Sequence, residues 1–179
     1  IIVYSYGRYD DLGKPSLGGF SPTGEGVLLR LTGERAKRFI KLYVNEYSAE
    51  GFEILDVDEH GERRVKEYFE SKFNSSDMLP SDPDKPYYND PDARIIDQYD
   101  LIENNCTTIS CEGLEEGGTK TFDDYEIITP IKPEHAKPIK LPTKKKYFAP
   151  SGLQQYLKYK SNQDESPVKN VTQDIISGG

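Results

Sequence analysis

The sequence has no apolar run that approaches the roughly 18 residues of a membrane-spanning helix. Its two cysteines are too few for the disulfide framework of a small secreted fold. Cys106 and Cys111 are five residues apart, so on one helix their side chains point about 140° apart and do not bond to each other. No further cysteine or histidine pair lies near them, which argues against a zinc site.

Positive charge is also scarce. The 179 residues include 23 Lys and Arg against 31 Asp and Glu, which gives a net charge of -8. This balance disfavours non-specific binding to nucleic acid or to an anionic membrane surface. The Gly-rich stretch over residues 7–26 is expected to be a long loop and lacks the phosphate-loop pattern, and the acidic residues 56–59 are too few for a calcium loop. We therefore expect no cofactor, no metal and no nucleic-acid partner.

Hydrophobic periodicity predicts alternating strands and helices. Strands or extended segments are expected over residues 1–6, 27–31, 52–57, 94–102 and 124–130. Helices are expected after the capping residues Thr32, Asp58 and Asn104 or Asn105, and over residues 150–160. The first helix is expected to end at Gly51, and the second to bury Val65, Tyr68, Phe69 and Phe73. This order predicts an α+β fold with helices packed on a partly antiparallel sheet.

The length suits one domain. Residues 1–130 are expected to form its α+β body, and residues 131–160 an extended Pro- and Lys-rich segment followed by a short helix. Residues 161–179 are polar and are expected to be a mobile tail. The strand-like start, IIVYSYGRYDD, has no initiating Met, so we expect the chain to be a piece of a longer protein.

The sequence supports two interpretations of Cys106. In the first turn of a helix, unsatisfied backbone N–H groups and the helix dipole favour a thiolate nucleophile, and the same N–H groups can bind an oxyanion. A buried cysteine that only packs is the alternative. A nucleophilic cysteine normally works with a histidine. His60 lies among charged residues and His135 between prolines, so both are expected to be solvated or loop residues.

Five segments then suggest a family. VYSYGRY, GEGVLLRLTGERAKRFI, YDLIENNCTT, EGLEEGG and APSGLQQYL occur in this order between about residues 3 and 157. Together they resemble the C-terminal toxin domains of Rhs-type polymorphic toxins. The NNCTT element also resembles the cysteine motif of permuted papain-like enzymes, the NlpC-like and lecithin-retinol-acyltransferase-like group.

The resemblance implies a permuted papain-like fold in which Cys106 is the nucleophile and Asn105 precedes it. It also implies a catalytic histidine on a strand just before VYSYGRY, and the sequence begins too late to contain one. We expect a missing N-terminal strand rather than lost catalysis. Alternating side chains of the first strand are expected to bring Ser5, or Tyr4 and Tyr6, near the thiol.

Three functions remain open from the sequence. The first is an antibacterial effector that hydrolyses or transfers an acyl group at an amide or ester bond through Cys106. The second is an inactive binding module of the same fold, and the third is a toxin with nuclease or nucleotide-modifying chemistry, which the negative charge disfavours. The resemblance further implies an Rhs or secretion-system carrier, a cognate immunity protein, and secretion or delivery into a competing bacterial cell.

Overall fold

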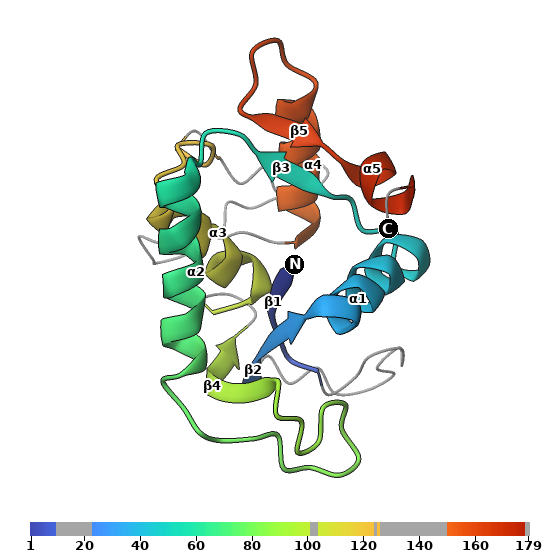
Figure 1. Cartoon of the computed structure of the whole chain (residues 1–179), viewed down its shortest axis with the longest axis vertical. Coiled ribbons are helices and arrows are strands. Elements are labelled where there is room, and N and C mark those ends of the chain that lie inside the picture. The colour runs from blue at the N-terminus through green and yellow to red at the C-terminus, as the bar shows by residue number, and fades with distance from the viewer. Residues whose placement is uncertain (10–22, 101–103, 124, 126–149, 178–179) are drawn as a thin grey trace, which may run out of the picture.

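The computed structural model describes residues 1–9, 23–100, 104–123, 125 and 150–177. Its helices and small antiparallel sheets confirm the α+β class. The elements are β1 (Ile2–Gly7), β2 (Thr23–Thr32), α1 (Gly33–Glu46), β3 (Phe52–Ile54), α2 (Glu59–Phe73), β4 (Ala93–Asp100), α3 (Cys106–Glu116), α4 (Pro150–Ser161), β5 (Val168–Asn170) and α5 (Thr172–Ser177). In Figure 1, β3, β5, α4 and α5 lie at one end and the other strands lie below them.

Strand β2 is the middle of a three-stranded sheet of order β1-β2-β4, and both pairings are antiparallel. Leu28 packs with Phe69 and Phe73 of α2, whereas Leu29 packs with Ala36 of α1. Successive strand side chains point to opposite faces of the sheet. A strand covered on both faces is therefore apolar at consecutive positions, which is why residues 27–29 read VLL.

A bulge interrupts the pairing of β2 with β4 between Gly26 and Val27. The Tyr6 hydroxyl of β1 donates a hydrogen bond to Asp97 of β4 across this point, at 2.6 Å. A Cβ atom on Gly26 would lie 2.1 Å from the Asp97 oxygen and 2.3 Å from the Tyr6 oxygen. Glycine is required because any side chain would displace this bond.

The predicted loop over residues 7–26 is wrong for its last four residues, which belong to β2.

Helix α1 begins after Thr32 as predicted, although the Thr32 side chain makes no capping hydrogen bond. The predicted stop at Gly51 is wrong, since the helix ends at Glu46 and Ser48 then adopts a φ of 54°. Gly51 has a different role. A Cβ atom there would lie 2.3 Å from Cδ1 of Ile175, so the glycine lets α5 approach the segment that leads into β3.

Helix α2 follows its prediction closely. The Asp58 side chain accepts the backbone N–H of Gly61 at 2.7 Å, and this hydrogen bond lowers the pKa of Asp58. The apolar stripe is also as expected: Phe69 and Phe73 are buried, and Val65 and Tyr68 pack against the same cluster. Asp58 is thus a helix cap.

Helices α2 and α3 approach closely at glycines. A Cβ atom on Gly61 would lie 2.3 Å from the carbonyl oxygen of Gly117, and one on Gly113 would lie 2.6 Å from the Phe69 ring. Small residues at these positions allow α2 to contact α3 directly. This contact fixes the direction in which the first turn of α3 points.

The C-terminal region corrects one expectation. The mobile tail predicted over residues 161–179 instead contains β5 and α5, and Val168 of β5 pairs with Ile54 of β3 and is 2% exposed. A three-residue strand and a six-residue helix are too short to show a period in sequence. Helix α4 confirms the helix predicted over residues 150–160. The strand predicted over residues 124–130 lies outside the described residues except for Tyr125, as does the extended segment before α4.

Within the described ranges, no helix combines the length and the apolar character that crossing a membrane demands.

Candidate functional site

Helix α3 begins at Cys106, immediately after its N-cap Asn105. The Asn105 side-chain oxygen accepts the backbone N–H groups of Thr107 and Thr108 at 2.9 and 3.0 Å. Asn105 is 3% exposed, so water does not compete freely for these bonds. Of the two candidate caps, Asn105 is therefore the one used, and Asn104 donates through its side chain to the Tyr6 hydroxyl at 3.2 Å. Cys106 occupies the first helical position, within the first turn that the sequence predicted.

The same cap occupies two of the N–H groups expected to bind an oxyanion. The N–H groups of Thr107 and Thr108 already donate to the Asn105 side chain. These two first-turn donors are thus committed within the protein. An oxyanion formed at the thiol needs a donor other than these two.

Tyr99, at the end of β4, supplies a hydroxyl at the thiol. The backbone N–H and the side chain of Cys106 lie close enough to its phenol to shift the pKa of Tyr99. Burial, with the negative charge of an ionised Cys106 as the next cause, raises the pKa of Tyr99 to about 12. Because the phenol stays protonated at neutral pH, Tyr99 can act as a hydrogen-bond donor next to the sulfur.

Three further tyrosines lie within electrostatic range of the thiol. Burial raises the pKa of Tyr43 to about 12, and it raises the pKa values of Tyr6 and Tyr9 well above the usual range. Cys106 makes a smaller contribution in the same direction in all three. These protonated phenols come from β1, the segment after it and α1, so the thiol lies where these elements meet α3.

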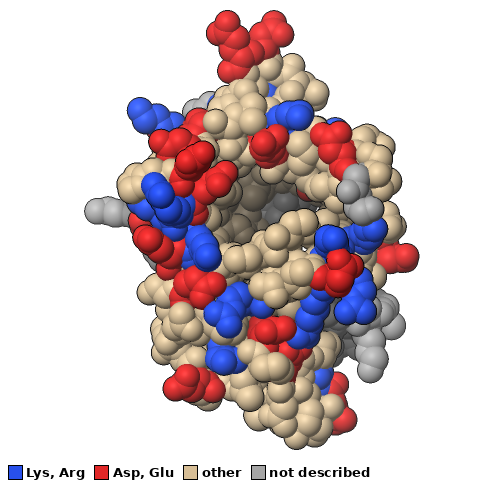
Figure 2. Space-filling view, viewed as in Figure 1, with Lys and Arg blue, Asp and Glu red and all other residues tan. Residues whose placement is uncertain are grey.

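The Cys106 side chain is half-buried and borders an open cleft of about 250 Å³. The lining residues come from α3, α4, β3 and the segment before β3; they are Ala49, Glu50, Phe52, Cys106, Thr107, Ser110, Leu153, Gln154 and Leu157. Figure 2 shows a hollow in the middle of this face, where those elements meet in Figure 1. Uncharged residues form most of the wall of the hollow, and Lys, Arg, Asp and Glu side chains lie farther out around it.

The predicted site residues have different surroundings. The Ser5 hydroxyl is hydrogen-bonded to the Tyr9 hydroxyl at 2.5 Å, so it does not point freely at the thiol. Tyr6 stacks on Tyr99, with ring centroids 5.7 Å apart. The β1 residues therefore reach Cys106 indirectly, through other tyrosines.

His60 is exposed at the start of α2, and its Nδ1 lies 3.3 Å from an Arg63 nitrogen. It is the single histidine in the part of the chain that the structure describes, and it does not line the cleft. His135 lies outside the described residues. Among the described residues, then, no imidazole accompanies the thiol.

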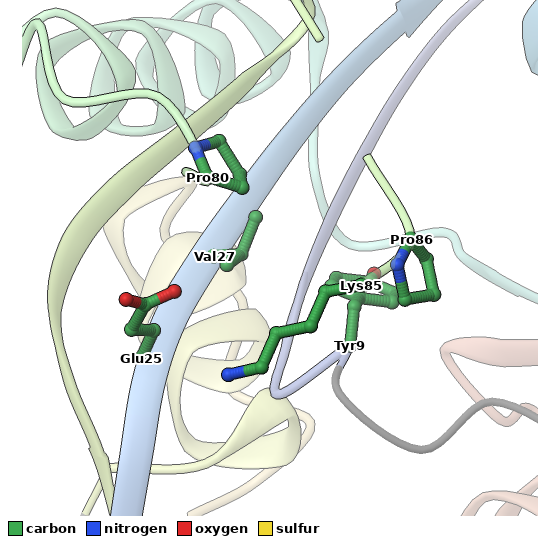
Figure 3. Close-up of a pocket in the computed structure, with 6 residues that line it drawn as sticks. All are labelled: Tyr9, Glu25, Val27, Pro80, Lys85 and Pro86. Atoms are coloured by element: carbon green, nitrogen blue, oxygen red, sulfur yellow. The ribbon is translucent and has the colours of Figure 1, made fainter. Parts of the chain in front are cut away.

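A second cavity lies on the other side of β2 from α2 (Figure 3). Tyr9, Glu25, Val27, Pro80, Lys85 and Pro86 line it. Its volume is about 10 Å³, which corresponds to a single water molecule at most. This cavity is too small to bind a substrate.

Sequence reasoning missed Tyr99 and the α4 wall of the cleft. The sequence pattern indicates an ordinary strand residue at Tyr99, seven positions before Cys106. It indicates the core face of a short helix at Leu153 and Leu157. No local signal places them near the thiol. Tertiary packing alone brings α4 and the end of β4 to the first turn of α3.

Comparison with protein-family models, with curated proteins and with solved structures finds no match to this chain. The family resemblance therefore stays a prediction, and a functional assignment rests on the residues around Cys106.

Proposed function

We propose that this chain is an antibacterial effector domain of permuted papain-like fold that hydrolyses or transfers an acyl group at an amide or ester bond. The position of Cys106 carries the proposal: it is the first residue of a capped helix and borders a cleft of about 250 Å³. A half-buried thiol in such a place can reach a bound carbonyl, whereas a cysteine that only packs would face the core.

In this reaction the Cys106 sulfur attacks the carbonyl carbon and its proton passes to a base. The carbon–nitrogen or carbon–oxygen bond breaks, and the amine or alcohol leaves with a proton. Water or another acceptor then cleaves the thioester and restores the thiol. Tyr99 is the candidate oxyanion donor, because its protonated hydroxyl lies close to Cys106 while the N–H groups of Thr107 and Thr108 are committed to Asn105.

The family resemblance assigns the base to a histidine on a strand before β1. Strand β1 contacts α3, and the N-terminus lies near the centre of the view in Figure 1. A strand that precedes β1 in a longer protein therefore starts from a point near the cleft. This arrangement supports testing the domain with its upstream segment attached.

One observation favours a second candidate, an inactive binding module. The histidine that the structure describes, His60, does not line the cleft. The net charge of -8 disfavours the third candidate, a nuclease.

The test is the viable count of bacteria that express the domain with its natural upstream segment, directed to the cytoplasm or to the periplasm. We expect killing in one compartment, loss of killing in Cys106→Ala, and retention in Cys111→Ala, the matched control on the same helix. Co-expression of the cognate immunity protein is expected to restore growth. Killing by Cys106→Ala at the level of the unmodified domain would rule out the nucleophile role.

A further inference from the structure

The two sides of the cleft differ in chemistry. Cys106 and Ser110 are one helical turn apart on α3, and the Ser110 hydroxyl donates to the carbonyl oxygen of Cys106 at 2.7 Å. Leu153 and Leu157 are likewise one turn apart on α4, and Phe52 of β3 lies with them in the lining. One side is therefore polar and carries the thiol, and the other is apolar.

The apolar side is held in place from behind. Leu153 and Leu157 also pack against the buried cluster of Cys111, Phe122 and Tyr125. Because the leucines are anchored on this core, the apolar wall is preformed. Preformed apolar walls with a few polar groups are typical of small-molecule and side-chain pockets.

Charge in the cleft is compensated. Glu50 is the one charged residue among the described residues that line it. Its carboxylate accepts hydrogen bonds from Gln154 at 2.9 Å and from the Lys158 ammonium at 3.0 Å. A charged substrate group of either sign would have to compete with this ion pair. An uncharged group avoids this penalty.

Size restricts the occupant further. Pockets for drug-sized molecules typically enclose about 300–1,000 Å³. A cleft of about 250 Å³ has room for one amino-acid side chain or a short acyl group beside the reacting carbonyl. The full length of a lipid chain does not fit.

We propose that the α4 side of the cleft is a specificity subsite for a short, uncharged aliphatic group on the acyl part of the substrate, with Leu153 and Leu157 as its contacts. This inference rests on the proposed function, which supplies the acyl substrate that the subsite would select. The subsite itself can be tested without turnover, because it requires only that Cys106 be reachable.

The probes are chloroacetamide and its N-isobutyl, N-octyl and N-(2-aminoethyl) derivatives. The Cys106 sulfur forms a bond to the CH₂ carbon, the carbon–chlorine bond breaks, chloride leaves, and the thiol proton passes to solvent. Rates are followed by intact-protein mass spectrometry and divided by the rates of N-acetylcysteine with the same probes. Cys106→Ala identifies any labelling elsewhere, and Cys111 is 0% exposed.

We expect the N-isobutyl probe to label Cys106 about tenfold faster than chloroacetamide, since burying about two methylene groups corresponds to about a factor of ten. We expect the N-octyl probe to gain nothing further and the aminoethyl probe to show no gain. Leu157→Asp is expected to remove the isobutyl preference. Leu157→Met, which keeps an apolar side chain of similar volume, is expected to retain it.

Equal corrected rates for all probes, a preference for the amine, or a preference that survives Leu157→Asp would each overturn the subsite. Failure of this inference is distinguishable from failure of the proposed function. Loss of killing in Cys106→Ala without any probe preference keeps the enzyme and removes the subsite. A clear preference with killing that does not need Cys106 keeps the subsite and removes the enzyme.

Discussion

The first turn of α3 and its later turns carry the same residue type in opposite surroundings. Cys106 is half-buried beside a cleft, next to a tyrosine hydroxyl. Cys111 is 0% exposed and packs with Phe122 and Tyr125. Neither Cys106 nor Cys111 forms a disulfide bond within the described part of the chain. Five residues turn the side chain through about 140°, so one helix presents one thiol to solvent and the other to the core.

This difference shows why a cysteine at a helix start cannot be judged from its local sequence. Capping by Asn105 fixes where the helix begins, but packing against α2 and the cluster behind α4 fixes its rotation. The buried turns are therefore expected to determine stability. The exposed turn is expected to determine reactivity.

The largest effect is expected in the buried region. Phe122 is 1% exposed, and Phe122→Ala should lower the free energy of unfolding by about 3–5 kcal/mol because it leaves a cavity beside Cys111. Urea unfolding measures this loss. Met78→Ala is the control, since Met78 is 63% exposed and should change stability by less than about 0.5 kcal/mol. Equal effects of the two variants would contradict a core behind α3.

A smaller loss is expected where α3 meets α2. A Cβ atom on Gly113 would lie 2.6 Å from the Phe69 ring. Gly113→Ala should gain about 1 kcal/mol of helix propensity but lose about 1–3 kcal/mol to overpacking, with a net loss in thermal and urea unfolding. Glu115→Ala, on the exposed face of the same helix, serves as the control. Stabilisation by Gly113→Ala would show that the two helices can separate at little cost.

The cap of the first turn should contribute less. Asn105→Ala removes the acceptor for two backbone N–H groups and should cost about 1 kcal/mol. Asn105→Asp keeps the acceptor and a favourable charge at the helix N-terminus, so it should recover most of that loss. The urea midpoints of the unmodified protein, Asn105→Ala and Asn105→Asp measure these differences in stability. An aspartate as destabilising as the alanine would mean that capping is not the role of Asn105.

The smallest effect is confined to alkaline pH. Unfolded tyrosine ionises near pH 10, whereas the pKa of Tyr99 in the folded protein is about 12. As pH rises above 10, the unfolded state loses this proton first, so stability falls until pH passes about 12. Tyr99→Phe should flatten this decline by about 1 kcal/mol or less at pH 10.5, measured as urea midpoints at pH 9 and 10.5. Parallel declines would indicate that Tyr99 is not shielded in the folded protein.

Much of the secondary structure follows from the sequence because its signals are local. Asp58 and Asn105 are good caps wherever they occur, and Gly117 ends α3 within the chain itself. Errors arose where partners are distant. Gly51 looked like a helix stop but accommodates Ile175, and Gly26 looked like a loop residue but lies under a hydrogen bond between two other strands.

By itself, the sequence determined the α+β class, the placement of Cys106 in the first turn of α3 and the separation of the two thiols, because capping and helical period depend on neighbouring residues. Only the tertiary structure decided what surrounds the first thiol. Tyr99 of β4 lies close to Cys106, and Leu157 of α4 and Glu50 from the segment before β3 line the same cleft, through packing between elements far apart in the chain. Such contacts depend on the shapes of buried surfaces, and a local pattern of residues does not encode them.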